Sequence, residues 1–136
     1  MVKSIIKSLL FFFALTVLTS SYSQQKSESD NKENNNLTVL VKYKVQPDKY
    51  EEAIAAMHSL ILEVKKEPNF VNIKILVDPS DNTNILLYEE WSDETYYKGD
   101  HMNTAHLQKF IGDSRRFLAG PPEISFWELN NNYSID

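Results

Sequence analysis

The stretch that decides the fold runs from residue 70 to residue 91 and reads FVNIKILVDPSDNTNILLYEEW. Two apolar segments, 70–77 and 84–91, flank the sequence DPSDNT, whose Pro, Asp and Asn residues favour a turn. Apolar segments on both sides of such a short turn are typical of an antiparallel hairpin. We therefore predict two neighbouring strands that are joined directly.

A strand and a helix are predicted before this hairpin. Residues 37–45, LTVLVKYKV, alternate side chains with the period of a strand. Asp48 and Glu51 have the spacing of a helix start signal, and Pro68 ends the helix. Between them, apolar residues recur every three or four positions, which predicts one buried helical face. These residues are Tyr50, Ala53, Ile54, Met57, Leu60, Ile61 and Val64.

A second helical region and a last strand are predicted after the hairpin. Ser92 is the expected N-cap of a short helix that ends near Tyr97 and is interrupted by Gly99. A longer helix is expected from Asn103 or Thr104, and the segment 120–122, Gly-Pro-Pro, ends it. Its expected inward face consists of Leu107, Phe110, Ile111, Ser114, Phe117 and Leu118. The last strand is EISFWEL, residues 123–129.

The predicted order βαββαβ indicates an α+β, ferredoxin-like fold, in which a four-stranded antiparallel sheet carries both helices on one face. The other face should be polar if water covers it, but residues 85–88 are apolar toward both sides of the sheet. A second copy of the same sheet is the simplest cover. We therefore expect a homodimer through the sheet face, that is, a dimeric α+β barrel.

Three regions are predicted along the chain. Residues 1–23 have Lys3 and Lys7 before a short apolar run and a small polar exit, the layout of a signal peptide. Residues 24–36 contain no apolar side chain and form a disordered linker, and residues 37–136 form the folded domain. We expect export to the periplasm or the extracellular space, with an uncleaved N-terminal anchor as the alternative.

Composition excludes several classes of function. The net charge is −5 and would become −7 without Lys3 and Lys7, so nucleic acid and, after signal removal, the membrane are poor partners. The absence of cysteine excludes thiol catalysis, thiolate metal sites and iron–sulfur clusters.

The segment 89–110 gathers the residues suited to chemistry, and its pattern resembles the antibiotic biosynthesis monooxygenase domain family, which includes quinol monooxygenases. The matching residues are the run Glu90-Trp91-Ser92-Asp93-Glu94, then Tyr96, His101, Thr104, His106 and Phe110. Glu67-Pro68 falls where members often carry Glu-Pro-Gly, but Asn69 stands here in place of Gly. The resemblance covers residues 37–129. It implies a dimeric α+β barrel and the oxidation of phenolic or quinol substrates with O₂, often without metal or flavin.

Such chemistry requires a base that removes a proton from the bound ring, and histidine suits that role at neutral pH. His101 is the first candidate for the base, and His106 is a second catalytic candidate that could orient the substrate or an ordered water. Each could instead be structural, His101 by bonding backbone or a carboxylate and His106 by lying at the edge of the core.

Five further residues are candidates for substrate binding, and three of them also have a structural alternative. Trp91 could be a stacking wall, or a core or interface residue. Glu89 is either a rim carboxylate or a buried acid with a raised pKa. Asn72 is a polar group of the cleft or an edge residue. The remaining two candidates are Tyr97 and Phe110.

Two other chemistries fit the sequence less well. His101 and His106 are five residues apart, which does not place two metal ligands on one helical face, so we predict no metal site. Haem-degrading relatives of this fold are expected to carry an Asn in the first strand and a Trp near the second helix, and neither is present here. The predicted function is therefore an exported monooxygenase without a cofactor that oxidises a small aromatic substrate with O₂. The alternative is a non-catalytic dimeric barrel that binds a small apolar or aromatic ligand.

Overall fold

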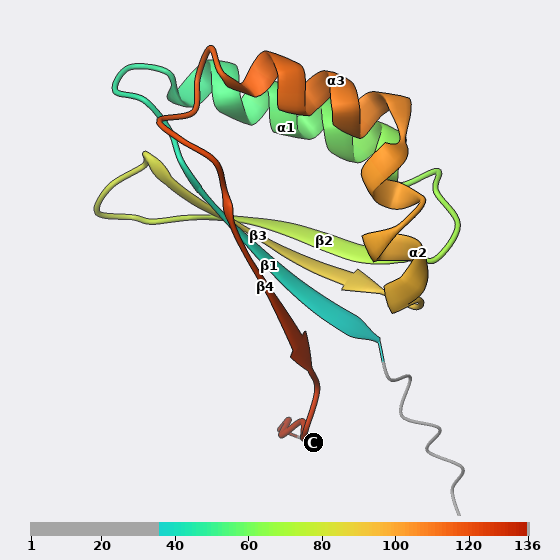
Figure 1. Ribbon diagram of the computed structural model, residues 1–136. Helices are drawn as coiled ribbons and strands as arrows, with labels where there is room; N and C mark the ends of the chain where they lie inside the picture. Colours follow the sequence, from blue (N-terminus) through green and yellow to red (C-terminus); the bar gives the residue numbers. More distant parts are fainter. Residues whose placement is uncertain (1–35, 136) are drawn as a thin grey trace, which may run out of the picture. The chain divides into compact units, whose positions relative to one another are not determined.

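The computed structural model describes residues 36–135, so the predicted signal peptide and nearly all of the predicted linker lie outside the described residues. The elements, in chain order, are β1 (Leu37–Lys44), α1 (Tyr50–Val64), β2 (Phe70–Val77), β3 (Asn84–Trp91), α2 (Glu94–Lys98), the 3₁₀ helix η1 (His101–Asn103), α3 (Ala105–Ser114) and β4 (Glu123–Glu128). This order confirms the predicted βαββαβ arrangement, with α2 and η1 as short additions before α3 (Figure 1).

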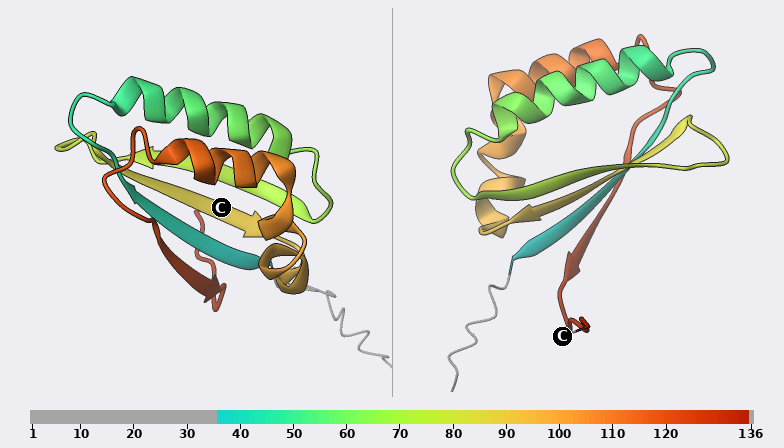
Figure 2. Two further views of the ribbon diagram at one scale, coloured as in Figure 1. Left: turned by 45° about the horizontal axis from the view of Figure 1, so that its top comes forward. Right: turned by 180° about the vertical axis from the view of Figure 1, so that it is seen from behind.

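The four strands form one antiparallel sheet in the order β2-β3-β1-β4. Helices α1 and α3 lie side by side over the same face of this sheet (Figures 1 and 2). The ferredoxin-like prediction is therefore confirmed. The hairpin of residues 70–91 forms as expected and places β2 at one edge of the sheet.

The core lies between the sheet and the two helices. Every second residue of β1 and β3 points toward the helices and is buried, as at Val39, Val41 and Leu87. Helix α1 contributes Ala53 and Met57 to this core, and both are fully buried. Each large apolar side chain removed from water in this way stabilises the fold by about 1.5–3 kcal/mol.

The predicted start signals of two helices are wrong by one or two residues. Asp48 adopts a left-handed turn, with φ of 62°, and α1 begins at Tyr50 without a side-chain cap. Asp93, not Ser92, caps α2, because its carboxylate accepts a hydrogen bond from the Tyr96 backbone amide at 2.7 Å. Ser92 is occupied elsewhere, since its backbone amide donates to the Asn69 carbonyl oxygen at 2.9 Å.

The turn before β2 keeps the geometry that a glycine would allow. Asn69 has φ of 67°, and Asn tolerates this left-handed region better than most residues. Asn69 can therefore form the same turn after Glu67 and Pro68 that a glycine would form.

The sheet face away from the helices carries apolar side chains in contact with solvent. Leu76 on β2 pairs with Leu86 on β3, and Trp127 on β4 pairs with Thr38 on β1, all on this face. Leu76 is 48% exposed and Trp127 is 56% exposed. Among the helices formed by residues 36–135, none has the length and apolar character needed to cross a membrane.

Candidate functional site

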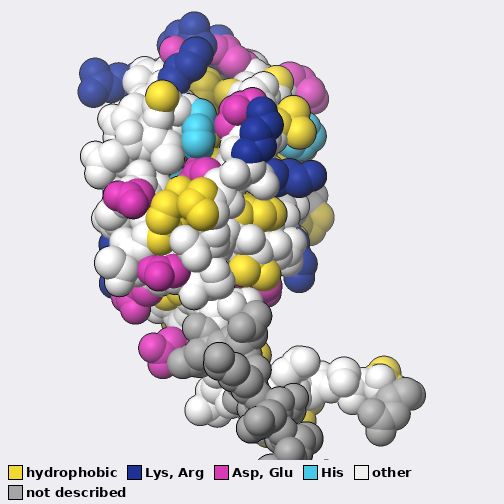
Figure 3. All heavy atoms as spheres, turned by 90° about the vertical axis from the view of Figure 1, so that its right-hand side faces the viewer, with side chains coloured by type: hydrophobic (Ala, Val, Ile, Leu, Met, Phe, Trp, Pro, Cys, Tyr) yellow, Lys and Arg dark blue, Asp and Glu magenta, His cyan; other side chains and the backbone are white. Residues whose placement is uncertain are grey.

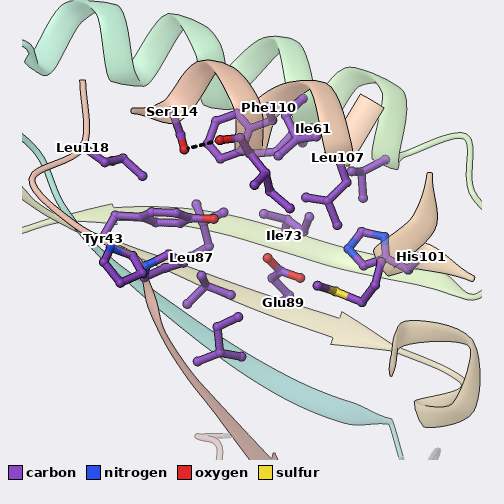
Figure 4. Close-up of a pocket in the computed structure, with 18 of the residues that line it drawn as sticks. Tyr43, Ile61, Ile73, Leu87, Glu89, His101, Leu107, Phe110, Ser114 and Leu118 are labelled. Carbon is purple, nitrogen blue, oxygen red and sulfur yellow. Dashed lines mark hydrogen bonds between the residues drawn. The ribbon is translucent and has the colours of Figure 1, made fainter. Parts of the chain in front are cut away.

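A cavity of about 460 Å³ lies between the sheet and the helices (Figure 4). This volume is within the range of small-molecule sites. Its walls are mostly apolar and come from α1, α3 and all four strands. They include Leu60, Ile61, Ile73, Leu87, Leu107, Phe110 and Ile124. The segment 120–122 completes the wall. It does not end the helix as predicted, because α3 already ends at Ser114.

Glu89 brings a buried carboxyl group to this cavity from the middle of the sheet (Figure 4). The Trp91 indole Nε1–H donates to Glu89 Oε2 at 3.0 Å. Burial raises the pKa of Glu89 to about 7, against the hydrogen bond from Trp91, which lowers it, and the charge of Glu67 adds to the rise. Glu89 is thus the buried acid of the two alternatives, and it can donate or accept a proton near neutral pH.

Tyr43 was not predicted as a site residue, yet its side chain also lines the cavity (Figure 4). Burial, and secondarily the charge of Glu89, raise the pKa of Tyr43 well above its ordinary range. Its hydroxyl is therefore a hydrogen-bond donor at any physiological pH. The alternation of β1 had placed Tyr43 on the buried face but gave no sign that an open space lies beside it.

His101 lies at the end of the cavity nearest α2 and lies in η1, not in a continuous α-helix. Its ring stacks on Tyr97, with ring centres 5.0 Å apart and an angle of 23°, and it also contacts the indole of Trp91. Its Nδ1 lies 2.8 Å from Glu67 Oε2. Burial lowers the pKa of His101, although Glu67 partly opposes this effect. The imidazole is therefore neutral at neutral pH and can accept a proton.

Glu67 is a second residue of this site, after Tyr43, that the sequence pattern did not identify as functional. Its side chain is only 5% exposed and contacts three partners, Tyr96, His101 and His106. The Tyr96 hydroxyl donates to Oε2 at 3.1 Å, whereas His106 Nε2 bonds Oε1. The only sequence signal was the Glu-Pro pair that resembles the family pattern.

The predicted site residues divide into two groups. His101, Glu89, Tyr97 and Phe110 line the cavity. Trp91, His106 and Asn72 do not line it.

Each of these last three residues lies outside the cavity lining for a different reason. Trp91 is fully buried behind His101 and contacts Tyr97, so it packs against the site and forms no open wall. His106 reaches the site only through Glu67. Asn72 pairs with Glu90, whose neighbours in β3 point toward the helices, so Asn72 lies on the opposite face of the sheet.

The end of the molecule near α2 is drawn in Figure 3, where histidine reaches the surface beside acidic and hydrophobic side chains. The side chain of His106 is 24% exposed, in contrast to 6% for His101. Within residues 36–135, no group of three or more His, Asp and Glu side chains has the arrangement of a metal site.

Comparison with known proteins shows which family the chain belongs to. The family model described as "Antibiotic biosynthesis monooxygenase" matches residues 36–113, more than half of the chain. "Putative monooxygenase YcnE" of Bacillus subtilis is 28% identical over 87 residues, which are 64% of this chain and 90% of that protein. The uncharacterized protein sll1783 of Synechocystis is 27% identical over 133 residues, which are 97% of this chain and 87% of that protein.

Solved structures show the same fold. A structure described as a putative antibiotic biosynthesis monooxygenase from Nitrosomonas europaea superposes with a TM-score of 0.66 at 22% identity, covering 71% of this chain and 91% of that one. A conserved protein from Methanosarcina mazei gives a TM-score of 0.63 at 24% identity, covering 68% and 91%. These identities support the architecture alone.

Proposed function

Because the chain belongs to the antibiotic biosynthesis monooxygenase family, we propose that it is a monooxygenase that oxidises a quinol or phenolic ring with O₂, without metal or flavin. The observation that carries this proposal is the apolar cavity that Tyr43, Glu89 and His101 line together. The apolar walls suit a flat ring, and in this proposal the three polar groups bind its oxygen atoms.

His101 is the proposed base. Its lowered pKa keeps the imidazole neutral, so it can take the proton of a ring hydroxyl. The resulting phenolate is electron-rich and gives an electron to O₂ far more readily than the neutral phenol. The apolar wall excludes water and holds the ring while the two radicals combine.

The reaction balances without an external reductant. The carbon–oxygen bond forms at the ring, the O–O bond breaks, and one oxygen atom leaves as water with two hydrogens taken from the substrate. An anthrone-type CH₂ group plus O₂ gives C=O plus H₂O, and a hydroquinone plus O₂ gives a hydroxyquinone plus H₂O. Glu89, with a pKa of about 7, can supply the proton that the departing oxygen needs.

Export and assembly belong to the same proposal. The layout of residues 1–23 supports export to the periplasm or beyond, and the exposed apolar side chains of the sheet support a homodimer. Neither nucleic acid nor, after signal removal, the membrane is a proposed partner, because the chain is acidic.

Oxygen uptake with a panel of hydroquinones and anthrones tests the reaction. We expect uptake with at least one ring substrate and a product that has gained one oxygen atom, labelled by ¹⁸O₂, and lost two hydrogen atoms. His101→Ala should lose this uptake, whereas His58→Ala, on the exposed side of α1, should keep it. Saturable binding of the same rings without any uptake would replace the enzyme by the alternative, a ligand-binding barrel.

A further inference from the structure

Glu67 connects three aromatic side chains that lie far from it in the sequence. It is located between α1 and β2, whereas Tyr96, His101 and His106 belong to α2, η1 and α3. A carboxylate with 5% exposure must have hydrogen-bond partners, since an unpaired buried charge costs far more than a paired one. Both of its oxygens are in fact occupied, Oε2 by His101 and Tyr96 and Oε1 by His106.

The chemistry of these contacts fixes where the proton of His101 lies. A carboxylate only accepts hydrogen bonds, so the nitrogen that faces it must carry a hydrogen. That nitrogen is Nδ1, at 2.8 Å from Oε2. In a neutral imidazole the other nitrogen, Nε2, then has a free electron pair. Within the described residues Nε2 has no hydrogen-bond partner, and the ring lines the cavity.

We infer that Glu67 is a positioning residue, which holds His101 through Nδ1 so that Nε2 faces the cavity as the proton acceptor. His106 acts through Glu67, because it anchors the second carboxylate oxygen and itself lies outside the cavity. When His101 accepts a proton, the positive imidazolium remains bonded to a negative carboxylate, which stabilises the charged form. This inference rests on the proposed function only in calling His101 a base.

The alternative is that Glu67 merely ties the segment after α1 to α2 and α3. Tyr96→Phe is the matched control, because it removes one of the three ties but leaves the contact between Glu67 and His101. The charged or titratable groups near His101 are Glu67, Tyr96 on the same carboxylate oxygen, Tyr97 stacked on the ring, His106 on the far side of Glu67, and Glu89 in the same cavity.

Nitrogen-15 NMR of the histidine rings in the full chain tests the inference without any substrate. In the wild-type protein we expect neutral His101 to carry its proton on Nδ1. In Glu67→Gln the protonation midpoint of His101 should fall by about one pH unit or more, because an opposite charge within 4–6 Å is worth roughly 1–3 units. Tyr96→Phe should move the midpoint much less.

Two results would overturn the inference. One is a wild-type His101 that carries its proton on Nε2, which can be seen even where Glu67→Gln does not fold. The other is an unchanged midpoint in a folded Glu67→Gln. Activity gives a separate readout: kcat of Glu67→Gln should fall and the acidic limb of its kcat/KM profile should move to lower pH, while Tyr96→Phe keeps both. If the NMR results are those expected but neither the wild-type protein nor any variant takes up oxygen, the proposed reaction is rejected and the role of Glu67 is retained.

Discussion

Trp91 and Glu89, two residues apart on β3, are joined side chain to side chain, with the indole N–H donating to the carboxylate at 3.0 Å. Both point to the helix-covered face of the sheet, and both are buried. Trp91 therefore occupies one oxygen of Glu89 and leaves the other for the cavity. An aromatic residue at the end of the strand thus acts on the site by orienting an acid, although it does not line the cavity itself.

Glu89 should make the stability of the fold depend on pH. Its pKa is about 7 in the folded chain and near 4.5 without the fold, so the folded state holds the proton more tightly. Between these two pH values the folded state binds more protons than the unfolded state, and stability falls as pH rises through this window. Glu89→Gln removes this titration. We therefore expect the free energy of unfolding of the variant, relative to that of the wild-type protein, to rise between pH 5 and pH 8 by about 3 kcal/mol at most.

Urea unfolding of both proteins at pH 5 and pH 8 measures this gain. The comparison uses the difference between the two proteins at each pH, which cancels the titration of groups that both share. A variant that keeps the same stability relative to wild type at both pH values would show that Glu89 is ionised in the folded chain.

His101→Ala should separate catalysis from folding. Loss of a general base lowers turnover by roughly 10²–10⁴-fold. A histidine with only a structural role behaves differently, because its loss costs about 1–3 kcal/mol of stability and affects turnover only through unfolding. Thermal unfolding and oxygen uptake are measured on the same sample, with His58→Ala as control. Full turnover in a folded His101→Ala protein would remove His101 from the mechanism.

The sheet face should mediate dimer formation. Leu76 and Trp127 are exposed on this face, and a charge there would be buried against the second copy. We expect the wild-type chain without residues 1–23 to elute as a dimer at micromolar concentration. Leu76→Lys and Trp127→Lys together should give a folded monomer, whereas Leu62→Lys, on exposed α1, should remain dimeric. Size-exclusion chromatography with light scattering decides this, and a monomeric wild-type chain would refute the barrel.

The fold could be predicted from the sequence because its signals are local. Alternation in β1, the three-and-four spacing in α1 and the turn residues between β2 and β3 each act over a few neighbours. The start of α1 was missed because Asp48 adopts a left-handed turn and does not cap the helix, and the start of α2 was missed because two residues compete for the cap. At α2, Ser92 and Asp93 are both good caps, and the hydrogen bond between the backbones of Ser92 and Asn69 decides between them.

The candidate site was only partly predictable, because its contacts are not local. His101 and Glu89 were expected from the chemistry of their side chains. Glu67 is 34 residues from His101, and a single sequence gives no signal that these two side chains form a hydrogen bond. Of the two alternatives for Asn72, the structure supports the edge residue and not the cleft residue, because β2 is an edge strand and Asn72 does not line the cavity. An apolar neighbourhood on a strand does not say which face a residue occupies. A bulge between Phe70 and Asn72 shifts the pairing there, and Asn72 ends opposite Glu90.

The cavity should be the binding site for aromatic ligands, and filling it should abolish binding without unfolding the chain. Ile73 lines the cavity from the edge strand β2 and is only partly buried, so a larger side chain can enter the space without displacing the central core. In Ile73→Trp the indole would occupy part of the 460 Å³ that a ring substrate needs.

Isothermal titration with the best ring from the oxygen-uptake panel measures the effect, and Leu62→Trp adds the same side chain on the exposed surface of α1 as a control. We expect at least a tenfold weaker affinity, which corresponds to about 1.4 kcal/mol, for Ile73→Trp and no change for Leu62→Trp. Equal affinity in a folded Ile73→Trp protein would place the ligand elsewhere, most directly on the exposed sheet face, and would separate His101 from the bound ring.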